Sequence, residues 1–590
     1  MRKLLVLTLV VCAALASGGV PTAQQASQPD LSAVASAQVD AIVVGAGLSG
    51  LSAAVEMGRA GLNVLVLDMN SVAGGHAVLA GGVALVGTPL QEKNGVKDSP
   101  DAAYKDWMQW TVDADPQWTR FYVENSRAMI YDWVTAMGVE FVRVGGGQAN
   151  SVPRIHFTKG RSIHLVMPIF KTALAMPNVT FVWNAKAERL VVESGRVQGV
   201  AIRHLRTGRT ETLRAPHTLL ATGGFESDLE RVLANWTPSL PRPDRLLIGS
   251  AISANGSGHD MAVEAGAALS RIDRHYIYID GLADPRDSQR IHALTGGNSR
   301  AIWVNAQGRR FTNENGFDKA ILADLLRQEP SSYWAVFDES ARENFGVRGA
   351  AWVQTPSDTH PILDNPDAAH KADTLEALAA KAGLPADALT GSITRFNVMV
   401  AGGEDTEFGR FRGRQRVPAR IEKPPFYAVQ FFPMTRKNMG GVAIDMQARV
   451  LNRTGQPVPG LLASGEITGS VGINGSHGMD GTFLGPAIMT GRLAGRTIAQ
   501  AVGARATTTT TPVTRSAPGA TGTLGTPPSL PPLLAKPRDG FWHFEVSHRI
   551  VTERKYACTT CHTPELPFAP IVTRVQREAQ TQVCVNCHDR

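Results

Sequence analysis

The sequence predicts an α/β fold of the Rossmann type, and two patterns near the start of the chain indicate it. An apolar run at residues 39–44 is typical of a buried strand, and the glycine-rich turn GAGLSG follows at residues 45–50. An apolar-periodic helix to about residue 60 and a second strand at residues 63–67 complete a βαβ unit. The glycine turn in this setting is much more specific than the turn alone.

The residues of this unit predict a dinucleotide site. Gly45 allows the tight turn, Gly47 lets the backbone approach a pyrophosphate, and Gly50 permits close packing of the helix. Asp68 follows the second strand directly, where a carboxylate accepts hydrogen bonds from an adenosine ribose. The unit by itself does not choose between NAD and FAD.

The end of the chain carries CxxCH twice, as CTTCH at residues 558–562 and CVNCH at residues 584–588. Two thiols can add to the vinyl groups of a haem, and the next histidine then ligates the iron. A zinc knuckle or a redox dithiol is the alternative, but the trailing histidines favour haem. We assign two covalent c-type haems to Cys558, Cys561, Cys584 and Cys587, with His562 and His588 as proximal ligands.

The tail also offers distal ligands for both irons. Residues 536–590 contain no methionine, and the only other histidines there are His543 and His548. Bis-histidine ligation of both haems is therefore expected, although either residue could instead be a surface histidine. Such ligation leaves no open iron position, so the haems would carry electrons.

The N-terminus has the pattern of a secretory signal peptide over residues 1–28. A basic start precedes an apolar run at residues 4–16, and small and polar residues follow. We therefore expect a periplasmic protein, and no later run is long enough to predict a transmembrane anchor. The fifth cysteine, Cys12, lies in this leader, so no thiol is left for a disulfide. The net charge of +7 comes without a basic run or a nucleic-acid motif, so no nucleic-acid partner is expected.

Five further motifs carry a resemblance to a known family. They are LLATGGFESD (219–228), GRRFTNE (308–314), MGGVAID (439–445), GLLASGEITG (460–469) and LGPAIMTGRLAGR (484–496). In this order they resemble the fumarate reductase and 3-ketosteroid dehydrogenase family of FAD flavoproteins, over roughly residues 38–505. Together with the haem motifs, the whole chain resembles a flavocytochrome c.

The resemblance implies FAD as the cofactor and gives roles to particular residues. Glu466 would bind the second ribose, and the helix starting near Gly485 would direct its N-terminus at the flavin. Some relatives attach FAD covalently through a histidine near His76, but the glycine spacing differs here, so noncovalent FAD is expected. The remaining glycines are expected around the flavin and its pyrophosphate (Gly74, Gly75, Gly81 and Gly82) and near the adenine (Gly223 and Gly224).

The same resemblance implies the domain organisation. The FAD-binding domain would be discontinuous, with residues 38–245 and 421–505 around an α+β capping domain at residues 246–420. Residues 506–535 are rich in Thr, Pro and Gly and predict a flexible linker. A small, mostly irregular or helical dihaem module would follow at residues 536–590.

The expected active site departs from the fumarate reductase pattern. In that pattern an arginine protonates the substrate, but the corresponding position here is Gly297, and Arg300 is the nearest replacement. His477 stands where ketosteroid dehydrogenases carry a proton-transferring tyrosine, so His477 or Arg300 would move the proton. Candidates to polarise a carbonyl or hold one carboxylate are Tyr276, Tyr278, Arg436 and Lys437.

These features predict an FAD-dependent oxidoreductase that acts on CH–CH bonds. The first hypothesis is a reductase of an enoate or enone other than fumarate. Its electrons would come from a quinol-linked or periplasmic cytochrome through the haems. The second is a dehydrogenase of the saturated counterpart, with electrons leaving through the haems. The third is an electron-transfer protein without catalytic activity.

Overall fold

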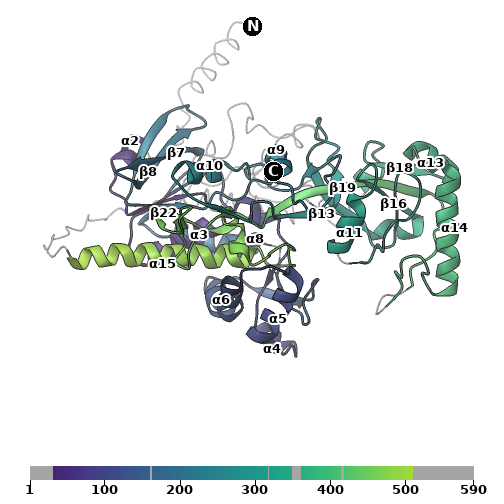
Figure 1. Ribbon diagram of the computed structural model, residues 1–590, viewed down its shortest axis with the longest axis horizontal. Helices are drawn as coiled ribbons and strands as arrows, with labels where there is room; N and C mark the ends of the chain where they lie inside the picture. Colours follow the sequence, from purple (N-terminus) through teal and green to yellow (C-terminus); the bar gives the residue numbers. More distant parts are fainter. Residues whose placement is uncertain (1–30, 160–161, 317, 349–359, 413–416, 509–590) are drawn as a thin grey trace, which may run out of the picture. The chain divides into compact units, whose positions relative to one another are not determined.

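The structure of the protein is a computed structural model that describes residues 31–159, 162–316, 318–348, 360–412 and 417–508. Figure 1 shows these residues as a ribbon coloured along the sequence. The predicted signal peptide, nearly all of the predicted linker and both haem motifs, with His543 and His548, lie outside the described residues. The statements about them stay predictions.

A six-stranded sheet carries the predicted βαβ unit. Its strands run in the order β21, β22, β10, β1, β2, β6, and neighbours are parallel except at the edge strand β21. They are β1 (Ala41–Val44), β2 (Val64–Leu67), β6 (Val179–Val182), β10 (His217–Leu220), β21 (Arg449–Leu451) and β22 (Pro457–Ala463). Every residue of β1, β2 and β10 is buried, as expected for a parallel sheet covered on both faces. The predicted Rossmann unit is confirmed.

Two helices of this part pack together through small residues. α3 (Leu48–Arg59) connects β1 to β2, and α15 (Leu484–Thr508) runs beside it (Figure 1). A side-chain carbon at Gly491 would lie 2.2 Å from the carbonyl oxygen of Ser49, and one at Gly495 would lie 2.7 Å from that of Ala53. Glycine at both positions therefore lets the two backbones touch.

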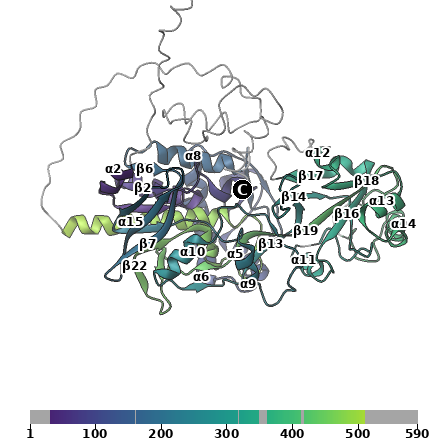
Figure 2. The ribbon, with the colours of Figure 1, turned by 90° about the horizontal axis from the view of Figure 1, so that it is seen from above.

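A second sheet of eight strands is built from residues between β10 and β21. Its strands run in the order β15, β16, β19, β13, β14, β17, and β11 and β18 also pair with β19. They are β11 (Leu247–Ile248), β13 (His275–Ala283), β14 (Ala293–Asn298), β15 (Ile302–Val304), β16 (Tyr333–Asp338), β17 (Phe345–Arg348), β18 (Ala369–Ala372) and β19 (Phe426–Asn438). Figure 2 shows β13 and β19 near its centre. All pairings except that of β11 are antiparallel.

The longest helices that accompany this sheet are α11 (Asp318–Leu326), α13 (Leu375–Ala382) and α14 (Ala386–Gly402). Buried aromatic side chains form much of its core, and they are Tyr333, Phe337, Phe345, Tyr427 and Phe431. An antiparallel sheet with its own helices and core fits the predicted α+β insertion. β19 belongs to this sheet, although its residues fall in the range predicted for the second part of the nucleotide-binding domain.

The remaining elements are mostly short. The helices are α2 (Leu31–Ser36), α4 (Pro89–Lys93), α5 (Pro100–Thr111), α6 (Pro116–Ser126), α7 (Asp132–Thr135), α8 (Ile163–Leu174), α9 (Leu229–Ala234), α10 (Ser257–Glu264) and α12 (His360–Leu363). The strands are β3 (Val83–Ala84), β4 (Phe141–Gly145), β5 (Ile155–Thr158), β7 (Ala185–Glu193), β8 (Arg196–His204), β9 (Thr210–Arg214), β12 (Leu269–Ser270) and β20 (Gly441–Val442). α4, α5 and α6 each begin with proline behind a capping side chain, which is a strong start signal. Within the described part of the chain, no helix has the length and apolar character needed to cross a membrane.

The ends of β13 and β19 bring the second sheet to the nucleotide-binding unit. Tyr276 is the register partner of Lys437, and His275 is that of Asn438. The backbone N–H of Phe225, in the loop after β10, donates to Asn438 Oδ1 at 2.7 Å. Residues of the insertion are thereby fixed next to the carboxyl end of the parallel sheet.

Substitution of Gly491 tests the close packing of α3 and α15. Gly491→Ala should lower the free energy of unfolding by about 1–3 kcal/mol, because the added carbon forces the helices apart. Gly503→Ala on the same helix is the matched control, since a side-chain carbon there meets nothing within 4 Å. Alanine should stabilise that position by up to about 1 kcal/mol. Denaturant unfolding followed by tryptophan fluorescence measures both, and equal effects would contradict the packing.

Candidate functional site

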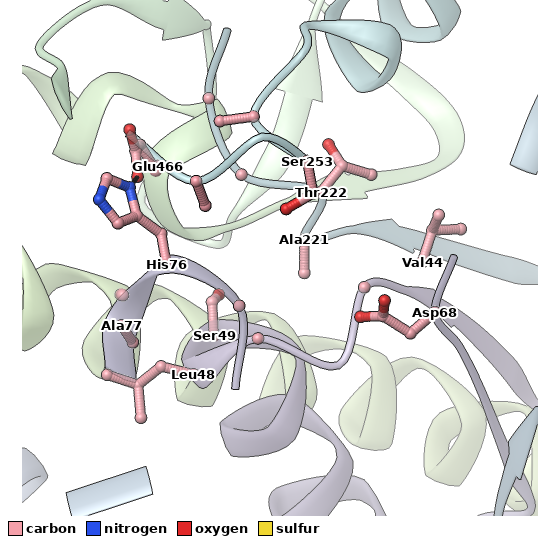
Figure 3. A pocket seen from close by; sticks show the side chains of 18 of the residues that line it. Val44, Leu48, Ser49, Asp68, His76, Ala77, Ala221, Thr222, Ser253 and Glu466 are labelled. Carbon is pink, nitrogen blue, oxygen red and sulfur yellow. Dashed lines mark ion pairs between the residues drawn. The ribbon is translucent and has the colours of Figure 1, made fainter. Parts of the chain in front are cut away.

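A cleft opens at the carboxyl ends of β1, β2 and β10, the edge of the sheet where this fold class binds ligands. Val44, Leu67 and Ala221 lie at or next to the three strand ends in its wall (Figure 3). Its empty volume is about 1100 Å³, with the solvent at its mouth included. The cleft extends from Asp68 at one end to Glu466 and His76 at the other, an elongated shape that suits a dinucleotide.

The three glycines of the turn have separate roles. Gly45 has φ +111°, and a side-chain carbon there would lie 2.3 Å from the carbonyl oxygen of Ala221. At Gly50 the same carbon would lie 1.9 Å from the carbonyl oxygen of Gly45, so this glycine serves packing and does not line the cleft. Nothing lies within 4 Å of such a carbon at Gly47, which faces the cleft as the N-cap of α3. The helix N-terminus is therefore open to a phosphate.

Asp68 lies in the cleft and is held in one orientation (Figure 3). Its Oδ2 accepts a hydrogen bond from the backbone N–H of Ala46 at 2.7 Å, and its Oδ1 accepts one from that of Asn70 at 2.8 Å. Burial raises the pKa of this carboxyl, and the two backbone bonds act in the opposite direction. The side chain thus joins the glycine turn to the end of β2, and its predicted contact with a ribose stays a prediction.

The other predicted cofactor residues divide into two groups. Gly74, Gly75, Gly223, Gly224 and Glu466 line the cleft, whereas Gly81, Gly82 and Gly485 do not. A side-chain carbon at Gly82 would lie 2.7 Å from Ile155 Cγ2, and one at Gly485 would lie 2.0 Å from the Tyr122 hydroxyl oxygen. Packing therefore explains those two glycines. At the start of α15, Leu484 and Ala487 line the cleft instead.

A buried charge cluster lies at the end of the cleft opposite Asp68 (Figure 3). Glu466 Oε2 is 3.8 Å from Lys437 Nζ and 3.6 Å from His76 Nδ1. Burial and the charge of Lys437 lower the pKa of His76 to about 3, so its imidazole is neutral at pH 7. Burial lowers the pKa of Lys437 to about 8, against the opposing charge of Glu466. Burial acts to raise the pKa of Glu466, but Lys437 and His76 bring it down to about 2.

Several polar atoms of the cleft wall have no hydrogen-bond partner within the protein. Nε2 of His76 and Oγ1 of Thr222 are both buried without such a partner. Buried polar groups without partners are costly, so such atoms indicate a polar ligand. The open helix N-terminus, the fixed carboxylate of Asp68 and these orphaned atoms together fit a flavin dinucleotide.

Comparison with known proteins defines the class first. The family model described as FAD binding domain matches residues 40–486. The chain is 32% identical over 468 residues to "Fumarate reductase (cytochrome)" of Shewanella frigidimarina, across 78% of this chain and 77% of the relative. It is 31% identical over 546 residues to a KsdD-like steroid dehydrogenase of Mycobacterium tuberculosis, across 78% of this chain and 96% of the relative.

Solved structures agree with these relatives. The open conformation of a flavocytochrome c3 fumarate reductase superposes with a TM-score of 0.66 at 27% identity, over 80% of this chain and 79% of that chain. The chain belongs to this family of FAD-binding flavoproteins. It is an FAD-dependent oxidoreductase of the class that acts on carbon–carbon bonds. The predicted family and FAD cofactor are confirmed, while the contacts of single residues with FAD stay predictions.

Aromatic residues predicted for the active site gather beside the cleft. Phe483 lines the cleft, and the ring of Tyr276 stacks on it with centroids 5.3 Å apart and planes at 14°. The ring of Tyr278 meets that of Tyr276 edge-on at 5.1 Å. Arg436 lies over the Tyr278 ring, 5.6 Å from its centroid, and donates a hydrogen bond to the carbonyl oxygen of Gly249.

The loop that carries His477 reaches this aromatic group, whereas Arg300 lies away from it. His477 is half-buried in the loop before α15, and a side-chain carbon at the next residue, Gly478, would lie 2.8 Å from the Tyr276 ring. Burial and the charge of Lys319 lower the pKa of His477 to about 4. Arg300 lies exposed between β14 and β15 and donates to the carbonyl oxygen of Ser340 at 3.0 Å. The structure thus brings together the predicted Tyr276, Tyr278, Arg436 and Lys437 and places the backbone next to His477 against Tyr276, but it leaves Arg300 outside this group.

The sequence analysis did not identify one buried pair of titratable residues, Glu226 and His275. His275 Nδ1 lies 2.8 Å from Glu226 Oε1, with both side chains buried, and His275 Nε2 lies 3.0 Å from the carbonyl oxygen of Asn235. Because the carbonyl accepts only from a protonated Nε2, one further proton is shared between Nδ1 and the carboxylate. Glu226 lies inside the quoted LLATGGFESD motif, and an acid after GGF was the available signal.

Replacement of Asp68 tests the ribose end of the cleft. Asp68→Ala should weaken FAD binding by about 10- to 100-fold, since a hydrogen bond to a charged group contributes about 1.5–3 kcal/mol. Asp40→Ala is the matched control, because Asp40 also accepts a backbone bond, from Asn63, but outside the cleft. Fluorescence titration of the apoprotein with FAD gives both dissociation constants. Equal values would remove Asp68 from the site.

Proposed function

We propose that the protein is a periplasmic reductase of a carbonyl-activated C=C bond in an enone or monocarboxylic enoate, not in fumarate. The observation that carries this proposal is that the arginines beside the cleft are already engaged by the protein. Arg274 pairs with Asp113, Arg271 donates to the Asp113 carbonyl oxygen, and Arg436 donates to the carbonyl oxygen of Gly249. Two substrate carboxylates would require fixed cationic partners. The relatives named fumarate reductase support reduction as the direction of the reaction, but the engaged arginines argue against fumarate as the substrate.

FAD and the side chains of the protein would supply different parts of the reaction. FAD, when bound, supplies the hydride for one carbon of the C=C bond. Lys437 is protonated below its pKa of about 8 and lines the cleft, so it is the candidate donor for the second carbon. His477, neutral at pH 7, would donate an N–H to the substrate carbonyl and so hold the developing negative charge. Tyr276 and Phe483 offer a flat apolar wall for the substrate.

Electrons for this reaction would arrive through the C-terminal haems. The support for two c-type haems is the CxxCH motif, which occurs twice, at residues 558–562 and 584–588. The signal-peptide pattern at residues 1–28 supports export, and covalent haem belongs with it. A quinol-linked or periplasmic cytochrome is the partner we propose.

A second function has its own observation. Burial lowers the pKa of His477 to about 4, so at pH 7 its neutral imidazole has one ring nitrogen without a proton, which can accept one from the substrate. Removal of a proton next to a carbonyl begins the dehydrogenation of a saturated ketone or acid, with hydride leaving to FAD. The KsdD-like relatives support this reverse direction.

A two-way substrate screen on the FAD- and haem-loaded protein separates the two functions. The reductase predicts oxidation of reduced viologen by enones or enoates, with fumarate at most a poor substrate. The dehydrogenase predicts reduction of ferricyanide by the saturated compounds. His477→Ala should lower kcat at least 100-fold in the active direction, as loss of an oxyanion donor does. Failure in both directions, with intact FAD and haem spectra, would contradict both functions.

The pH profile tests the role of Lys437. Reduction should decline as pH rises through about 8, because Lys437 loses its proton there. Glu466 raises the pKa of Lys437, so Glu466→Gln should move this decline to lower pH. Glu188→Gln is the control, since Glu188 pairs with Arg203 at an exposed position. A decline at the same pH in all three proteins would exclude Lys437 as the donor.

A further inference from the structure

A single carboxylate on a strained turn holds the loop that carries His477. We propose that Asp113 is a positioning residue that fixes the His477 loop against the cleft. This inference rests on the proposed function, in which His477 works at the substrate carbonyl. Nothing in the sequence motifs assigns a role to Asp113, which follows the end of α5.

The strain lies at Val112, the residue before Asp113. Val112 has φ +70° and ψ −54°, and the backbone N–H of Asp113 donates to the carbonyl oxygen of Thr111 at 2.9 Å. These values define the γ-turn with positive φ, which is rare and strained, and more so for a β-branched residue. The Val112 side chain is 62% exposed, so its own burial does not compensate. Contacts from outside the turn must hold it.

Those contacts come from the His477 loop. The backbone N–H of Ser476 donates to the carbonyl oxygen of Thr111 at 3.1 Å, and Ser476 Oγ donates to Asp113 Oδ1 at 2.7 Å. Gly475 touches the turn so closely that a side-chain carbon would lie 2.6 Å from the same carbonyl oxygen. The γ-turn therefore fits the backbone of the loop immediately before His477.

The other side of Asp113 is tied to the segment between β12 and β13. Arg274 Nη2 lies 3.3 Å from Asp113 Oδ2, and Arg271 donates to the Asp113 carbonyl oxygen. Burial acts to raise the pKa of Asp113, but Ser476, Arg274 and Arg271 together hold it below its usual value. The carboxylate is thus ionised and joins three segments distant in sequence.

The same carboxylate balances the charges that face His477. Lys319 and Arg274 act to lower the pKa of the imidazole, and Asp113 acts to raise it. Asp113 therefore contributes both to the contacts that hold the loop, together with the carbonyl oxygen of Thr111, and to the charges around His477. A loop released from Asp113 would let the segment of His477 and Gly478 move away from the Tyr276 ring, which now lies against Gly478.

Kinetics of matched variants test this role in the fully loaded protein. Asp113→Ala should lower kcat at least 10-fold, while KM and the FAD dissociation constant change less than twofold. Asp113→Asn, which retains an acceptor for Ser476 Oγ, should recover much of the loss, and Ser476→Ala should lower kcat less than Asp113→Ala. Asp101→Asn is the control, because Asp101 pairs with Arg120 at a 90% exposed position.

Chemical modification gives a second readout that does not depend on turnover. Carbethoxylation of His477, followed by mass spectrometry of its peptide, should be several-fold faster in Asp113→Ala than in the unchanged protein. The buried His156 is the internal reference and should react equally in both. Unchanged kcat and unchanged His477 reactivity in Asp113→Ala and Ser476→Ala would overturn the inference. If His477→Ala itself keeps full activity, the proposed function fails instead.

Discussion

The hydrogen bond from the backbone of Phe225 to Asn438 is the contact on which the site depends. It joins the loop after β10 of the parallel sheet to the last residue of β19, and it is buried at 2.7 Å. The fit is close, because a side-chain carbon at Gly224 would lie 2.1 Å from Asn438 Oδ1. With this contact in place, Lys437 lies beside Glu466 at one end of the cleft, and Tyr276 is the register partner of Lys437 in β13. The cofactor cleft and the insertion thereby become one site.

Charge inside this site is closely balanced. Two buried carboxylates have a basic partner: Glu466 is opposed by Lys437, and Glu226 by His275. Buried charges require such partners, since their removal from water is costly. A site with paired charges and a neutral imidazole suits a substrate that brings one carbonyl or carboxylate. Relatives with the same sheet can therefore act on different compounds, because the side chains around the cleft, not the fold, select the substrate.

Local patterns predicted the parts of the structure that local interactions determine. The roles of Gly45, Gly47 and Gly50 follow from a turn of six residues, and the buried strands follow from apolar runs. The motif resemblance also pointed to Glu466, which lines the cleft, and to His477, whose neighbour Gly478 lies against the Tyr276 ring. The resemblance pointed to Gly485 at the start of α15. In the structure Gly485 packs against Tyr122, and the preceding residue, Leu484, lines the cleft.

The sequence did not predict contacts between residues that lie far apart along the chain. Asp113 meets Ser476 across 363 positions, and no periodicity connects a γ-turn at one helix end to a loop near another. The pair of Glu226 and His275 likewise depends on how β13 passes the loop after β10. Arg300 was a candidate because it lies three residues after Gly297, the position of the expected arginine. The turn between β14 and β15 instead directs its side chain to the carbonyl oxygen of Ser340.

A crystal structure of the FAD-loaded protein with a bound enone is the most direct test. The account predicts the flavin ring in the cleft in contact with Phe483 and Lys437, and the enone carbonyl within hydrogen-bond distance of His477. A flavin in the cleft whose substrate carbonyl is held by other residues, far from both His477 and Lys437, would contradict it.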